Sequence, residues 1–317
     1  MKNSNPAIIT AEKKRHGKGK MEPRIFHTLN YSFLTILCLV MLYPMLNTLA
    51  VSLNEGMDVI RGGIYIWPRM FTLVNYRIVL DMHTIYDSFF MSVYRTVVAV
   101  ITNLFFTSIL AFAISRREYI LGKFITVVFV LTMYFDAGLI PNFLLIQSLG
   151  MLNTFTVYWL PGLVSAFNLI VMRTYMRTVS ESLIESARID GAGDFRVYWQ
   201  IVMPLCKPVI ATIALFVAVN SWNAWFDTFI YNSGAQHLSV LQYELQRLLA
   251  STMIASGQTG QQAATTMQAQ IATGASITTP IAIRATITIV AAVPILLVYP
   301  FLQRYFVHGM QLGGIKE

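Results

Sequence analysis

Charged side chains are scarce in this sequence. Only 12% of its 317 residues are Asp, Glu, Lys or Arg, whereas 56% are hydrophobic. A soluble domain carries about 25% charged residues, so a chain of this length lacks the polar side chains that a water-facing surface needs. The mean hydropathy of +0.58 points the same way. The composition therefore indicates a protein that is embedded in a lipid bilayer.

Cysteine is almost absent as well. Cys38 and Cys206 lie far apart in the sequence and form neither a disulfide framework nor a metal-ligand spacing. The net charge of +8 comes from basic residues that lie between long apolar runs, not from one basic face. A secreted disulfide scaffold, a zinc module, a disordered chain and a nucleic-acid partner are therefore not indicated.

The sequence does contain six apolar runs of roughly 20 residues, the length that an α-helix needs to cross a hydrocarbon core of about 30 Å. The runs are Tyr31–Leu53, Thr96–Ser115, Phe124–Leu149, Met151–Met172, Pro208–Phe226 and Ala285–Gln303. In lipid, every backbone polar group needs a partner within the protein, so a span is a helix or part of a closed barrel. Barrel strands are segments of about ten residues that alternate in polarity, and these runs do not alternate. The prediction is an all-α membrane protein with six transmembrane helices.

The distribution of basic residues gives the orientation. If the N-terminus is inside, most of the 23 Lys and Arg residues fall in inner segments, so both termini are expected in the cytoplasm. Residues 1–24 are read as a flexible basic tail and residues 25–317 as the membrane domain. The first apolar run is too long for a removable signal peptide. Residues 54–86 and 231–280 are then outer loops, and the local structure of 251–279 is left open.

One inner segment, residues 180–204, reads as two short helices joined by a glycine turn. Ser180 can cap a helix over Glu181–Ile189, Ser182 and Glu185 have capping-box spacing, and Gly191 can end the helix. A second helical stretch, Phe195–Met203, precedes Pro204. A knob of this kind suits insertion into a groove on a soluble partner, and an ordinary structured loop is the alternative.

The residues of this segment resemble the "EAA" loop of ABC importer permeases. Its pattern is Glu-Ala-Ala, three residues, Gly, nine residues and Ile-x-Leu-Pro. This chain departs from the pattern at Ser186 and Met203. The matching residues are Glu185, Ser186, Ala187, Asp190, Gly191, Ala192 and Ile201-Val-Met-Pro204.

The resemblance extends over about residues 25–317. Gly62–Pro68, Gly138–Pro141, Trp222–Asp227 and Arg304–Gly309 are similar to stretches of the MalG/LplC-type carbohydrate permeases. It implies the MetI-like fold of a type I ABC importer permease in the bacterial plasma membrane. It also implies a second permease subunit, two cytoplasmic ATPases, an extracytoplasmic solute-binding protein and a carbohydrate substrate, with oligo- or polysaccharides favoured.

On this resemblance, residues Glu185 through Gly191 would lie in the cleft of an ATPase and, with Ala192, transmit its closure to the pore. The chain has no phosphate-binding loop, so ATP and Mg would be held by the partner ATPases and no cofactor by this chain. It also lacks the His-Glu-x-x-His and Gly-x-Ser-x-Gly motifs of two enzyme classes.

Polar residues inside the spans are candidates for the substrate pathway. A charge at mid-bilayer costs roughly 2.5–3.5 kcal/mol, so Arg95 is expected to pair with a carboxylate or, alternatively, to contact substrate. Asp136 interrupts the third span. A second set recurs at i, i+3, i+7 and i+11 on one face of the fifth span, where it would line the pore for sugar hydroxyls or pack against neighbouring helices. That set is Asn220, Asn223, Asp227 and Tyr231. Trp222 and Trp225 lie on another side and are expected at the membrane interface.

Three other functions remain open at this stage. A permease for another solute, such as a peptide or an amino acid, would share the 180–204 loop. A membrane-embedded enzyme would need catalytic residues near one interface, and none assemble in the sequence. A membrane scaffold or receptor would explain the spans but not the helix-glycine-helix loop.

Overall fold

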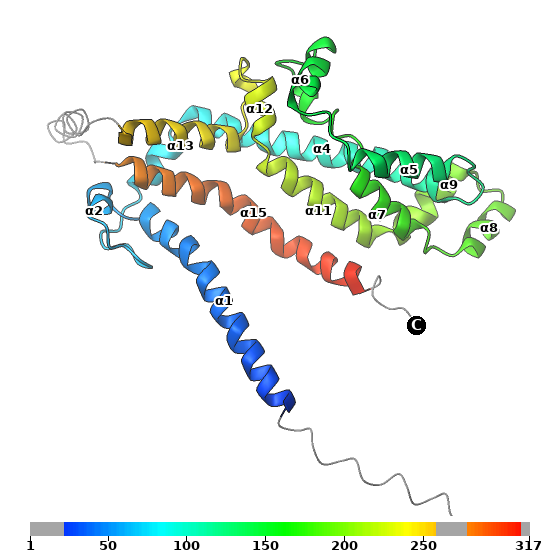
Figure 1. Ribbon diagram of the computed structural model, residues 1–317, viewed down its shortest axis with the longest axis horizontal. Helices are drawn as coiled ribbons and strands as arrows, with labels where there is room; N and C mark the ends of the chain where they lie inside the picture. Colours follow the sequence, from blue (N-terminus) through cyan, green and yellow to red (C-terminus); the bar gives the residue numbers. More distant parts are fainter. Residues whose placement is uncertain (1–21, 258–277, 312–317) are drawn as a thin grey trace, which may run out of the picture.

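The computed structural model describes residues 22–257 and 278–311, so residues 1–21 of the predicted 1–24 tail and most of 251–279 lie outside them. Within these ranges the chain is helical, with one isolated bridge between Asn54 and Phe71 as its only β-pairing. The end of the bundle that carries residues 180–204 is called the inner end below, and the opposite end the outer end (Figure 1).

Three helices are long and apolar enough to cross a membrane as continuous elements. They are α1 (Glu22–Ser52), α4 (His83–Ser115) and α15 (Pro280–Gln311), and they contain the first, second and sixth predicted spans. The N-terminal half of α1 leaves the bundle obliquely, and its apolar side chains are exposed (Figure 1). In the membrane, lipid or a neighbouring protein would cover these exposed apolar side chains.

The third and fourth predicted spans are not continuous helices, so that part of the prediction was wrong. The third divides into α5 (Gly122–Thr132) and α6 (Leu139–Ser148). Gly138, with a φ of +86°, allows the chain to turn between them, because this backbone region is open to glycine and costly for other residues. The fourth begins with a 3₁₀ turn, η1 (Phe155–Tyr158), and becomes α-helical only in α7 (Ala166–Met176).

The fifth span is bent at one end and broken at the other. At the inner end, α9 (Asp194–Val197) continues through a π turn and meets α11 (Lys207–Asn223) at an angle of 81°. At the outer end α11 stops, and α12 (Phe226–Tyr231) starts after Ala224 and Trp225. The set from Asn220 to Tyr231 therefore does not lie on one continuous helix.

The predicted outer loops contain helices. Residues 54–86 include α2 (Gly56–Ile60), α3 (Val74–Leu80) and the first turn of α4. Residues 231–280 include α13 (Leu241–Gly257), which packs against α4 and α15. These helices were not predicted because their composition is mixed, since helices that cover the end of a bundle need only one apolar face.

Apolar packing differs between the two ends. At the inner end Leu169, Met172 and Met176 of α7 pack with residues of α4, α11 and the 180–204 segment. At the outer end Trp222 is buried against α4 and α15, and its indole N–H donates to the Ala291 carbonyl at 3.4 Å. The prediction that Trp222 lies in an interfacial belt was therefore wrong.

Candidate functional site

The segment 180–204, called the elbow from here on, has the two-helix form that its sequence predicts. Its first helix, α8 (Glu181–Ile189), begins directly after Ser180. The Ser180 hydroxyl bonds to the Ser182 hydroxyl at 2.7 Å and does not cap a backbone N–H, so the predicted cap and capping box do not form. Helical propensity and packing are therefore enough to start this helix.

Gly191 ends α8 in a left-handed conformation, as predicted. Its φ is +81°, and its N–H donates to the Arg188 carbonyl at 2.9 Å. The Ala192 N–H donates to the Ala187 carbonyl at 2.9 Å. These two bonds satisfy carbonyls that the end of a helix leaves free, and glycine makes the turn without a steric penalty.

The elbow has one buried face and one exposed face. Ile184 is fully buried, and Ala187 and Ala192 pack against the same inner core. Of the motif residues between Glu185 and Ala192, those that remain exposed are Glu185, Ser186, Asp190 and Gly191. Apolar side chains stand beside them, with Ile189 exposed to 86%, Phe195 to 68% and Trp199 to 54%. Exposed apolar side chains of this size, rimmed by polar ones, are typical of a surface that binds another protein.

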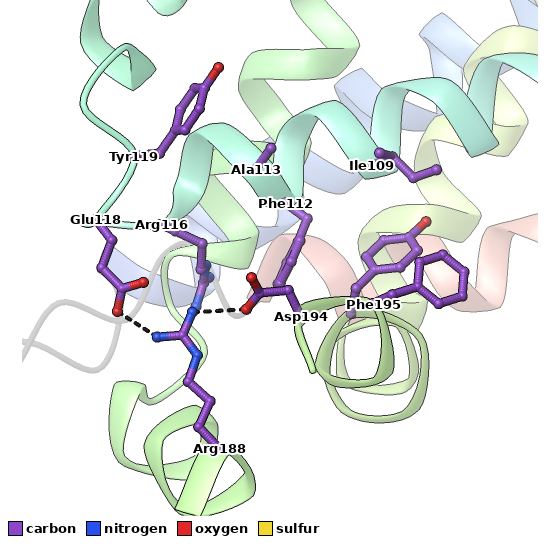
Figure 2. A pocket seen from close by; sticks show the side chains of 10 residues that line it. Ile109, Phe112, Ala113, Arg116, Glu118, Tyr119, Arg188, Asp194 and Phe195 are labelled. Atoms are coloured by element: carbon purple, nitrogen blue, oxygen red, sulfur yellow. Dashed lines mark hydrogen bonds and ion pairs between the residues drawn. The ribbon is translucent and has the colours of Figure 1, made fainter. Parts of the chain in front are cut away.

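A cavity of about 400 Å³ lies between the elbow and the inner end of α4 (Figure 2). Arg188 belongs to its lining and donates to Glu118 at 2.5 Å and to Asp194 at 3.0 Å. Hydrogen bonds to these two carboxylates raise the pKa of the Arg188 guanidinium above its usual value. The guanidinium therefore keeps its charge at every physiological pH.

Arg95 pairs with a carboxylate within the membrane region, as expected, and the carboxylate is Asp227. Both terminal nitrogens of Arg95 donate to Asp227, and one of them also donates to the Ala224 carbonyl at 3.1 Å. The guanidinium carbon lies 4.4 Å from the centre of the Tyr158 ring. Ala224 is the residue at which α11 stops, so Arg95 satisfies a carbonyl that the break leaves free.

A cavity of about 590 Å³ opens beside this ion pair. Three of the four residues predicted to form the stripe line it, namely Asn220, Asp227 and Tyr231. A second cavity, of about 790 Å³, shares Asn220 with the first and continues past Asn103 and Asn168. Both linings include amide and aromatic side chains, and each volume is within the size range of small-molecule sites.

Two of the predicted pathway residues lie elsewhere. Asn223 is exposed on α11 and does not belong to the lining of either cavity in the described chain. The break after it turns α12, and with it Asp227, toward another side. Asp136 is exposed in the turn between α5 and α6, where its carboxylate accepts the Gly138 N–H at 3.2 Å. Its position identifies it as a turn residue in this structure.

The sequence did not identify two of the polar residues in this lining, Tyr158 and Asn142. The Tyr158 hydroxyl donates to the Leu238 carbonyl at 2.7 Å and bonds to the Thr228 hydroxyl at 3.0 Å. Tyrosine within an apolar run gives no periodic signal, because the run already reads as a span. The available sign in the sequence was that Tyr158 lies close to Pro161 and Gly162, which interrupt the fourth span.

Comparison with known proteins places the chain among transport proteins. Residues 24–312 match the family described as the binding-protein-dependent transport system inner membrane component. The polygalacturonan/rhamnogalacturonan transport system permease protein YtcP of Bacillus subtilis (strain 168) is 35% identical over 74% of this chain and 81% of its own length. Protein LplC of the same organism is 33% identical over 92% of this chain and 95% of its own length.

A solved structure agrees with this assignment. The chain is similar to a subunit in the crystal structure of a bacterial ABC transporter involved in the import of the acidic polysaccharide alginate, with a TM-score of 0.80 and 28% identity. The match covers 92% of this chain and all of that one. The sequence, the helical architecture with its elbow and these relatives together show that the chain belongs to the family of binding-protein-dependent transport system inner membrane components, as a multi-pass protein of the plasma membrane.

Proposed function

We propose that this chain is one of two permease subunits of an ATP-driven importer for carbohydrates, with an oligo- or polysaccharide as its substrate. The relatives support the substrate class, since their names refer to polygalacturonan/rhamnogalacturonan, arabinooligosaccharides and alginate. The cavity supports it chemically. Amide, hydroxyl and carboxylate groups can bond to sugar hydroxyls, and the Tyr231 and Tyr158 rings offer faces for C–H surfaces.

The elbow is proposed as the site at which an ATPase subunit docks. The single observation that carries this proposal is the two-sided form of α8, in which Ile184 anchors the helix while its motif residues stay exposed. In this assignment Glu185, Ser186, Asp190 and Gly191 face the ATPase, and Ala187 and Ala192 hold the elbow on the core. Ile189 would supply an apolar anchor, because its side chain is 86% exposed.

The remaining partners follow from this role. ATP and Mg would be bound by two cytoplasmic ATPase subunits, and a second homologous permease would complete the pore. A solute-binding protein would deliver substrate at the outer end. This chain would hold no cofactor and catalyse no reaction. Its own residues would bind the sugar, transmit the movement and seal the path.

Asn220, Asp227 and Tyr231 are proposed to line the substrate path. The break between α11 and α12 supports this assignment, because irregular backbone at membrane depth is tolerated where it is buried in protein or lines a water-filled cavity. Asn223 and Asp136 are not part of this proposed path, because neither of them lines the cavity.

The proposal is tested by affinity purification of the tagged chain from a bacterial membrane. We expect an ATPase and a second permease to copurify, and the reconstituted complex to hydrolyse ATP faster when its binding protein carries an oligosaccharide. Glu185→Lys should abolish this stimulation while leaving the chain in the membrane. Purification without an ATPase, or uptake of a tetrapeptide but of no glycan, would refute the assignment.

A further inference from the structure

We propose that Arg188 is a positioning residue that ties the elbow to α4 and so gives the elbow a side-chain route into the membrane domain besides its two connections along the chain. This inference rests on the proposed function, in which an ATPase moves the elbow. The route has three members, namely Arg188 on α8, Glu118 in the turn after α4, and α4 itself.

Along the chain, the elbow is connected to only two of the membrane helices. Residues 177–180 join α8 to α7, and residues 190–206 join it to α11. Helix α4 has no such connection, although its inner end lies against the elbow (Figure 2). A movement of α8 would therefore reach α4 only through side chains.

The guanidinium of Arg188 supplies such a connection. One terminal nitrogen donates to Glu118 at 2.5 Å and the other to Asp194 at 3.0 Å (Figure 2). Glu118 follows the last residue of α4 by three positions, and Asp194 is the first residue of α9. A planar fork with two donors can bind carboxylates on two elements at once, which a lysine cannot do in the same geometry.

The other basic residue at the centre of the elbow lacks this reach. The Arg196 side chain bonds to Gln200, one turn away in its own helical segment, at 3.0 Å. It carries the same charge as Arg188 and lies only eight positions farther along, so it provides a matched control.

Helix α4 can carry the movement across the membrane because it is continuous. It has 33 residues, which corresponds to about 50 Å at 1.5 Å per residue. It also carries Arg95, which binds Asp227 and the Ala224 carbonyl in the wall of the cavity. The third, fourth and fifth spans are broken, so α4 is the least deformable connection from the elbow to this wall.

The pair is suited to transmitting movement and contributes little to folding. The side chain of Arg188 is 31% exposed, that of Glu118 67% and that of Asp194 73%. Exposed ion pairs add little to stability, so variants that lack one partner should fold and insert normally. Their effect should appear in the coupling between ATP hydrolysis and transport.

The test uses the complete reconstituted transporter in proteoliposomes and measures oligosaccharide accumulated per ATP hydrolysed. We expect Arg188→Ala and Glu118→Ala to lower this ratio by about two- to fivefold, the range that a partly exposed ion pair supports. The amount of ATPase in the complex should not change. Arg196→Ala should leave the ratio at the wild-type value.

A charge exchange separates the link to α4 from the brace within the elbow. In an Asp194→Asn background, Arg188→Glu should lower the ratio, and adding Glu118→Arg should restore it. An unchanged ratio in both alanine variants, an equal fall in Arg196→Ala, or no restoration by the exchange would overturn the inference. A wild-type complex without substrate-stimulated hydrolysis would overturn the proposed function as well.

Discussion

Gly191 offers the sharpest test of the elbow, because a substitution at this position has a conformational cost but no steric cost. Its φ of +81° lies in the left-handed region, and a Cβ built on it would meet no atom within 4 Å. The cost of Gly191→Ala is therefore conformational and not steric, about 1–2 kcal/mol. That corresponds to roughly a tenfold smaller population of the native turn.

Gly191→Pro should cost more. The proline ring requires a φ near −65°, and proline lacks the N–H that donates to the Arg188 carbonyl at 2.9 Å. Asp190 would also have to leave its near-helical conformation, with φ −72° and ψ 4°, because the residue before a proline disfavours it. Together these effects exceed about 3 kcal/mol, and the end of α8 should rearrange.

The assay is ATP hydrolysis stimulated by the substrate-loaded binding protein in proteoliposomes. We expect a partial loss in Gly191→Ala and a nearly complete loss in Gly191→Pro, with normal insertion of both chains in the membrane. Gly193→Ala is the matched control, since Gly193 has a φ of −69° and equally open surroundings. If Gly191→Ala equals Gly193→Ala and Gly191→Pro remains stimulated, the assignment of the turn is wrong.

Three further predictions concern the membrane domain. Arg95→Ala should destabilise the protein by about 1–3 kcal/mol in detergent unfolding, less than a fully buried pair because the Asp227 side chain is 25% exposed. Adding Asp227→Ala should cost little more, whereas additive losses would show that the two residues are not coupled. Asn220→Ala should reduce oligosaccharide uptake while Asn223→Ala does not, and equal effects would contradict the pathway assigned here. Burial raises the pKa of the Cys206 thiol to about 11, so its alkylation at pH 8 should be roughly a hundredfold slower than for a free thiol and should accelerate as the pH rises toward 11; a normal rate at pH 8 would mean that this side chain is accessible.

The elbow could be predicted almost residue by residue, and the reason is local. The bounds of α8, its stop at Gly191 and the second helical stretch depend on short-range rules for helices and glycine. The capping bonds were wrong because Ser180 and Ser182 bond to each other. Which face of α8 is buried could not be predicted, because Ile184 and Leu183 are equally apolar in the sequence and only the neighbouring α7 and α11 distinguish them.

The membrane domain was harder to predict from composition. Hydropathy locates runs that can enter lipid, but it does not register whether the backbone within a run is continuous. The first, second and sixth spans are continuous, whereas the third, fourth and fifth are broken. The signs of a break were present at Gly138 and at the Pro161-Gly162 pair, but Ala224 gave none. The carbonyl that it leaves free accepts a hydrogen bond from Arg95, 129 positions earlier in the sequence.

The break at Ala224 links architecture to the proposed transport. A carbonyl released from a helix inside lipid must find a donor, and Arg95 supplies one while its charge is balanced by Asp227. An unbroken helix would have needed neither residue. The break therefore requires a charged pair at membrane depth, and such a pair is stable only if protein or water surrounds it. Because Asp227 remains partly exposed to the cavity that Asn220 and Tyr231 also line, the same feature that interrupts the helix creates a polar wall. In this domain, hydrogen-bonding groups for a sugar would be provided where the helices are incomplete.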